Sequence, residues 1–125
     1  MGNNIIKEAK LHHSGVSAID FEKTVEFYTK GLGMTIHHVW ADGTAAMLDI
    51  GNGSYIEIFS YGKKCPVDNL SWTHLAIETS DVDGAYEAAL AAGATDNAKP
   101  VDAEFCRIAF VYGLNNEIIE FFKFL

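Results

Sequence analysis

Four side chains that could bind a metal ion occupy matching places in the two halves of the sequence. They are His13 and Glu57 in the first half, and His74 and Glu120 in the second. Each glutamate interrupts an apolar run, YIEIFSY or EIIEFFKF, where a lone carboxylate would be strongly disfavoured by desolvation. Two carboxylates and two imidazoles around one divalent cation remove that penalty. This ligand set suits Zn, Ni, Co or Fe better than Ca or Mg.

Strand alternation predicts where these side chains point. Successive residues of a strand face opposite sides, so Glu57 and Glu120 face away from the aliphatic neighbours that would pack on a helix. We therefore expect His13, Glu57, His74 and Glu120 to lie on the open faces of their sheets and to share one metal ion. His12 replaces His13 as the ligand if the strand register shifts by one residue.

An internal repeat supplies the elements that would position these residues. The segments LHHSGVSAIDFEKTVEFYTKGLGM and WTHLAIETSDVDGAYEAALAAGA align His13 with His74 and Asp20 with Asp81. Each aspartate is a predicted helix N-cap. The helix that follows should end at Gly33 in the first half and at Gly93 in the second. Strands are predicted after these helices, over 34–41, 44–50 and 54–60 in the first half and over 97–102, 104–112 and 116–124 in the second.

Each half therefore reads β-α-β-β-β. We expect an α+β fold in which two such modules, about 10–61 and 72–124, form a curved sheet around a metal-binding cavity. Because neither module buries its own sheet, the two should pair within one domain covering residues 1–125.

Composition limits the partners. The chain has 125 residues, with 17 acidic and 9 basic side chains and a net charge of −8, which argues against nucleic acid or a membrane as a partner. The two cysteines, Cys65 and Cys106, show no disulfide framework, and no apolar run is long enough for a signal peptide or a membrane span. We expect a cytoplasmic protein with a small-molecule substrate.

The chain resembles the vicinal oxygen chelate superfamily, which includes glyoxalase I, methylmalonyl-CoA epimerase, extradiol dioxygenases and bleomycin resistance proteins. The segments that carry the resemblance are HSGVSAIDFEKTVEFYTKGLGM, YIEIF, THLAIETSDVDGAYEAALAAGA and NEIIEFF. The resemblance implies paired βαβββ modules and the metal ligands His13, Glu57, His74 and Glu120. It also implies a homodimer.

Within the superfamily, this ligand set is similar to that of the glyoxalase I-like lactoylglutathione lyases. The implied activity converts the hemithioacetal of a 2-oxoaldehyde and a thiol into a hydroxyacyl thioester, by proton transfer through an enediolate. The implied cofactor is one divalent transition metal, Ni, Zn or Co. Glu120 is the first candidate for the catalytic base and Glu57 the second.

Alternatives remain open at this point. A methylmalonyl-CoA epimerase-like isomerase, a non-catalytic small-molecule binding or resistance protein, and an Fe(II) oxygenase use the same fold. Glyoxalase I commonly has Arg and Asn where this chain has Ser17 and Tyr61, which leaves the thiol carrier undetermined. Lys63, Lys64 and Arg107 are candidates to hold an anionic part of the substrate.

Overall fold

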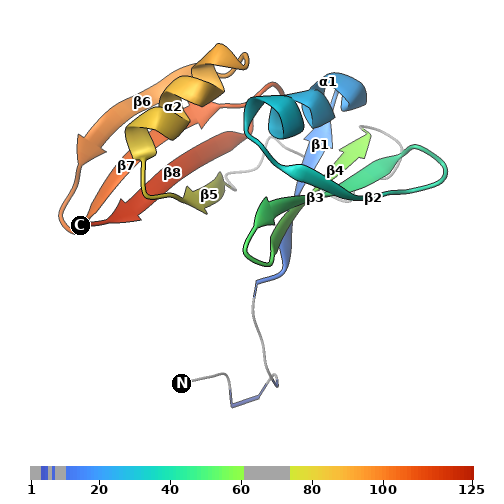
Figure 1. Cartoon of the computed structure of the whole chain (residues 1–125), viewed down its shortest axis with the longest axis horizontal. Helices are drawn as coiled ribbons and strands as arrows, with labels where there is room; N and C mark the ends of the chain where they lie inside the picture. Colours follow the sequence, from blue (N-terminus) through green and yellow to red (C-terminus); the bar gives the residue numbers. More distant parts are fainter. Residues whose placement is uncertain (1–3, 6, 8–10, 61–73) are drawn as a thin grey trace.

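The computed structural model describes residues 4–5, 7, 11–60 and 74–125, and these form two modules (Figure 1). The first contains β1 (His13–Ala18), α1 (Phe21–Glu26), a π-helical turn η1 (Phe27–Gly31), β2 (Thr35–Val39), β3 (Ala45–Gly51) and β4 (Ser54–Ser60). The second contains β5 (His74–Glu78), α2 (Val82–Ala91), β6 (Thr95–Asp102), β7 (Cys106–Tyr112) and β8 (Ile118–Phe124).

Each module has one four-stranded mixed sheet with the same topology. The strand orders are β1-β4-β3-β2 and β5-β8-β7-β6. The first pair in each order is parallel and the other pairs are antiparallel. The predicted α+β fold of two βαβββ modules is therefore confirmed. The two sheets remain separate and do not close into one continuous sheet (Figure 1).

The helix boundaries follow from their capping residues. The Oδ1 atom of Asp20 accepts a hydrogen bond from the backbone N–H of Lys23 at 3.1 Å, and that of Asp81 accepts one from Gly84 at 2.9 Å. These carboxylates satisfy backbone donors that a helix start leaves unpaired. Gly33 and Gly93 follow the helices with φ values of 77° and 115°, which glycine adopts without strain. The predicted caps and stops are confirmed.

The first helix differs from the regular helix that its sequence predicts. After Glu26 it widens into η1, in which the N–H of Leu32 reaches the carbonyl of Phe27, five residues back, at 3.1 Å. A π-turn accommodates one extra residue in the helix. Its register places two adjacent aromatic side chains, Phe27 and Tyr28, in the core together.

The apolar core lies between the helices and the sheets and continues through both modules. Ile56 and Ile58 of β4 are completely buried in it, as are Ile119 and, almost completely, Phe121 of β8. The residues between them alternate to the opposite face of each sheet. This arrangement confirms the predicted orientation of both apolar runs.

A buried polar cluster joins the two modules. Asn115, in the turn between β7 and β8, accepts a hydrogen bond from the N–H of Ile19 at 2.8 Å and donates to Thr24 Oγ1 at 3.0 Å. Tyr28 donates to Glu117 Oε2 at 2.7 Å, and Glu117 Oε1 accepts from the N–H of Asn115 at 2.8 Å. We call these five residues the inter-module joint. Because each buried polar group has a partner here, the joint fixes how the modules meet.

Burial raises the pKa of Tyr28 well above its usual value, and the adjacent Glu117 carboxylate raises it further. The tyrosine is therefore a neutral donor to that carboxylate throughout the ordinary pH range. None of the helices in the described part of the chain combines the length and apolar character that crossing a bilayer requires.

Candidate metal and substrate site

His13 and Glu57 lie together on the face of the first sheet opposite to its helix. β1 and β4 are adjacent parallel strands, and their ladder pairs His13 with Tyr55 and Gly15 with Glu57. The separation between Nε2 of His13 and Oε1 of Glu57 is 3.4 Å. The histidine side chain is 40% exposed and the glutamate side chain 12%, so the histidine is the more accessible of the two.

The geometry of this pair fits two ligands of one transition metal ion. Ligand bonds of about 2.1 Å in a tetrahedral site place neighbouring ligand atoms roughly 3.4 Å apart. An imidazole nitrogen and a carboxylate oxygen are also the donor types that Zn, Ni and Co accept. His13 and Glu57 would therefore supply half of the predicted site.

Glu120 occupies the corresponding face of the second sheet. In the ladder it pairs with Ala76 of β5 and Phe110 of β7, and its buried neighbours Ile119 and Phe121 lie on either side of it in β8. Its side chain is half-buried. The backbone of His74 opens β5, but its side chain lies outside what the structure describes.

The structure does not bring Glu120 to the first pair. Within residues 4–5, 7, 11–60 and 75–125, no three His, Cys, Asp or Glu side chains are grouped closely enough to hold a metal ion. The reason is that the glutamates belong to two sheets that do not close. The full set of four ligands stays a prediction.

His12 contacts His13 rather than replacing it. The two Nδ1 atoms are 2.9 Å apart. The His12 ring stacks on Tyr55, with ring centroids 4.8 Å apart and an angle of 21° between the planes. The backbone N–H of Tyr55 also donates to the carbonyl of His12 at 3.2 Å. Sequence reasoning considered His12 only as an alternative ligand, because alternation gives no signal for contact between adjacent residues at a strand's start.

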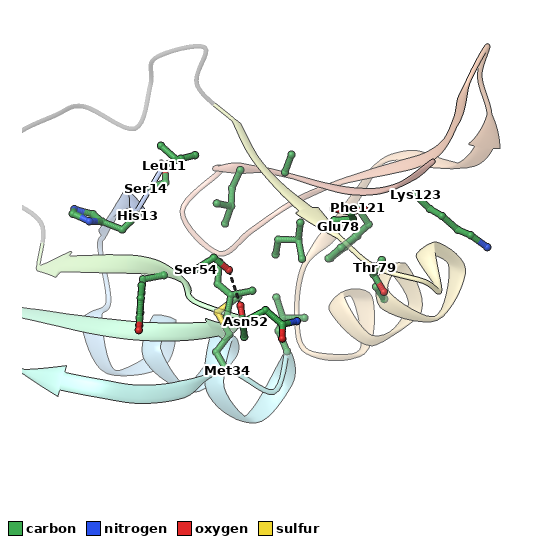
Figure 2. A pocket seen from close by; sticks show the side chains of 18 of the residues that line it. Leu11, His13, Ser14, Met34, Asn52, Ser54, Glu78, Thr79, Phe121 and Lys123 are labelled. Atoms are coloured by element: carbon green, nitrogen blue, oxygen red, sulfur yellow. Dashed lines mark hydrogen bonds between the residues drawn. The ribbon is translucent and has the colours of Figure 1, made fainter. Parts of the chain in front are cut away.

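A cleft of about 890 Å³ lies between the modules, beside this histidine pair. Its lining includes His13 at one end and Glu78, Thr79 and Lys123 at the other (Figure 2). Apolar residues from both modules line the space between these ends: Leu32, Met34, Ile50, Leu75, Ile77 and Phe121. Such a volume, with apolar walls and a few polar groups, is typical of small-molecule sites. We call this space the inter-module cleft.

Among the described residues that line the cleft, the cation is Lys123, which was not one of the predicted candidates. Arg107, one of the predicted candidates, donates to both oxygens of Asp83 at 2.8 and 3.0 Å and to Asp102 at 2.9 Å. These bonds raise the pKa of Arg107 and lower that of Asp83, so the guanidinium ties α2 to its sheet. Lys63 and Lys64 lie outside the described residues. The sequence did not indicate a role for Lys123, because it lies among alternating aromatic and polar residues at the exposed end of its strand.

Comparison with known proteins decides the family. The profile of the glyoxalase/bleomycin resistance protein/dioxygenase superfamily matches residues 10–121. The chain belongs to this superfamily. The match spans both modules and the described site residues His13, Glu57 and Glu120. The predicted membership of the vicinal oxygen chelate group is thereby confirmed at the level of the superfamily.

Solved structures of the superfamily's fold cover nearly the whole chain. A glyoxalase/dioxygenase from Nostoc punctiforme is 19% identical, with a TM-score of 0.76, and the match covers 100% of this chain and 99% of that one. TioX from Micromonospora sp. ML1 is 22% identical, with a TM-score of 0.76, over 94% of this chain and 100% of its own. At these identities the likeness shows the fold alone. A search of curated proteins found no match.

The superfamily typically binds a divalent metal and contains many metal-dependent enzymes, together with non-catalytic resistance proteins. The pair His13–Glu57 is consistent with the first property. Ser17, which stands where glyoxalase I commonly has an arginine, is buried at 2% exposure and offers no positive charge.

Proposed function

We propose that this protein is a divalent-metal-dependent lyase of the glyoxalase type, acting on the hemithioacetal of a 2-oxoaldehyde and a thiol. The observation that carries the proposal is the 3.4 Å separation of His13 Nε2 and Glu57 Oε1 on the open face of the first sheet. His13, Glu57, His74 and Glu120 would hold one Ni, Zn or Co ion. When bound, such an ion would act as a Lewis acid and stabilise the negative charge that develops on the substrate.

The remaining chemistry belongs to the side chains. Glu120 takes the proton from the hemithioacetal carbon and returns it to the neighbouring carbonyl carbon, while the hemithioacetal hydroxyl proton passes to the former carbonyl oxygen. Glu57 is the second candidate for this base. Glu120 does not line the inter-module cleft, because its neighbours Phe121 and Lys123 occupy the face of β8 that does. The substrate would therefore bind at the open face beside His13 and Glu57.

We further propose that the protein is a homodimer in which two copies complete each site. Glu120 lies apart from His13 and Glu57 within the described part of one chain, which supports a site shared between copies. A second copy would bring its own second module to the open face of the first sheet. The dimer would then contain two equivalent sites, as two-fold symmetry requires.

Metal titration and a thioester assay test the activity. We expect purified protein to bind one Ni, Zn or Co ion per chain and to form a thioester from methylglyoxal with at least one of several thiols, without oxygen uptake. His13→Ala and Glu57→Gln should each lose metal affinity and turnover. The matched control is His38→Ala, because His38 is another exposed strand histidine and packs against Trp40 instead.

Three outcomes would contradict the proposal. Metal binding without thioester formation from any thiol would leave a binding or resistance protein, and substrate-dependent oxygen uptake with Fe(II) would indicate an oxygenase. If His13→Ala bound metal with unchanged affinity, His13 would not be a metal ligand and the proposed site would be wrong.

A complementation experiment tests the shared site. His13→Ala and Glu120→Gln should each be inactive alone, but subunits mixed and allowed to exchange should form heterodimers with one intact site. About half of the dimers would then be mixed, and activity should recover to roughly a quarter of the native value. No recovery after verified subunit exchange would show that each site is built within one chain.

A further inference from the structure

The contact between His12 and His13 bears on the form in which His13 could bind a metal ion. A separation of 2.9 Å between two imidazole nitrogens is a hydrogen-bond distance, so one Nδ1 carries a proton and the other accepts it. Neutral imidazole has one N–H and one free lone pair. The direction of this single bond therefore determines whether Nε2 of His13 is free to bind a metal ion.

The distance on the other side of His13 distinguishes the two directions. If His13 accepted at Nδ1, its Nε2 would carry the proton and would donate to Glu57. A hydrogen bond to a carboxylate is typically about 2.7–2.9 Å long. The observed separation is 3.4 Å, longer than that and equal to the spacing expected for two ligands of one ion. The geometry thus favours His13 as the donor at Nδ1, with Nε2 unprotonated.

The His12 ring is held in place for this contact. Its stacking on Tyr55, at 4.8 Å and 21°, fixes the plane of the imidazole, and the backbone bond from Tyr55 fixes the main chain. Tyr55 itself is anchored in β4 and pairs with His13 in the ladder. The acceptor is thereby presented at a defined place although His12 is exposed.

We propose that His12 is a positioning residue. It accepts the Nδ1–H of His13 and so keeps Nε2 of His13 in the unprotonated form that a metal ion requires. This inference rests on the proposed metal role of His13 and Glu57. Groups that orient a metal-binding histidine typically change metal affinity by about 10–100-fold when they are removed.

Two variants separate the hydrogen bond from the ring packing. His12→Phe keeps a ring against Tyr55 but removes the acceptor, whereas His12→Asn keeps an acceptor near the position of Nδ1 but removes the ring. Zn²⁺ affinity is measured by competition with a chromophoric chelator. We expect a loss of about 10–100-fold in His12→Phe and a change of only a few-fold in His12→Asn.

The tautomer of His13 is read separately by ¹⁵N NMR of the metal-free protein, at a pH where the histidines are neutral. We expect the Nδ1–H tautomer in the native protein and in His12→Asn, and a shift toward Nε2–H in His12→Phe. An unchanged tautomer and unchanged Zn²⁺ affinity in His12→Phe would overturn the inference, as would an Nε2–H tautomer in the native protein. If the native protein binds no Zn²⁺, the proposed function fails, while the tautomer still decides whether His12 orients His13.

Discussion

Glu57 and Glu120 are the same residue type at equivalent places of equivalent strands. Glu57 faces a histidine nitrogen at 3.4 Å, whereas Glu120 lies between Ala76 and Phe110 in its ladder. In the proposed mechanism, Glu57 holds the metal ion together with His13, and Glu120 moves the proton.

Glu120→Gln tests this division of roles. Since the amide keeps the shape of the carboxylate but accepts no proton, turnover should fall by about 10²–10⁴-fold. The variant should retain measurable metal affinity, because His13 and Glu57 remain. Glu57→Gln should show the larger loss of metal affinity in the same titration. Full activity of Glu120→Gln would show that another residue is the catalytic base.

Because of Tyr28, the free energy of unfolding should decrease as the pH rises into the alkaline range. Its pKa is raised in the folded protein, chiefly by burial, while the unfolded chain releases this proton near pH 10. The contribution to stability is therefore complete below about pH 10 and is lost as the pH rises toward the folded pKa. Hydrogen bonding to Asp96 raises the pKa of Tyr86 to about 12, which adds a loss of the same sign.

Urea unfolding measured between about pH 8 and pH 11 checks this. The native protein should lose stability above about pH 10, and Tyr28→Phe should lose less with pH. At neutral pH, Tyr28→Phe should itself be less stable by about 1–3 kcal/mol, because Glu117 loses a buried partner. The matched control is Tyr112→Phe, an exposed tyrosine on β7. A pH profile unchanged in Tyr28→Phe would refute the assignment.

At the scale of the elements, the second helix depends on its N-cap. Asp81→Ala removes the carboxylate that accepts from Gly84, so the free energy of unfolding should fall by about 0.5–2 kcal/mol. Glu87→Ala is the control, because Glu87 is exposed on α2 and lies beyond its first turn. Equal stabilities of the two variants in thermal or urea unfolding would show that the cap contributes nothing.

The elements were largely predictable because local signals define them. The aspartate caps, the glycine stops and the alternation around Glu57 and Glu120 each depend on a few neighbouring residues. The strands from 35 to 60 and from 95 to 124 accordingly lie within a few residues of their predicted positions. The π-turn was not predictable, because a regular helical stripe includes Tyr28 but not its neighbour Phe27, and only packing determines that both are buried.

The candidate site was predictable only within each module. The alternation of side chains along each strand predicted that His13 and Glu57 lie on the same face of the first sheet. It carries no information on how two sheets are oriented, so the sequence could not decide whether His13 and Glu57 meet Glu120 within one chain or between two copies. The contact between His12 and His13 depends on the chain just before β1, where alternation does not apply.

For the whole molecule, the inter-module joint controls how the halves meet. Asn115→Ala removes the bonds to Ile19 and Thr24 and leaves buried polar groups without partners. We expect a loss of about 1–3 kcal/mol in urea unfolding. Asn97→Ala is the control, since Asn97 is exposed in β6. A native-like stability of Asn115→Ala would mean that the apolar core alone orients the modules.

The joint also limits how this protein could be recombined. Its acceptors and donors are divided between the two modules: Tyr28 and Thr24 belong to one, and Asn115 and Glu117 to the other. A chimaera that takes its second module from a relative with apolar residues at 115 and 117 would bury the Tyr28 hydroxyl without an acceptor. Fusions of diverged halves should therefore fold well only when both sides of this contact are transplanted together.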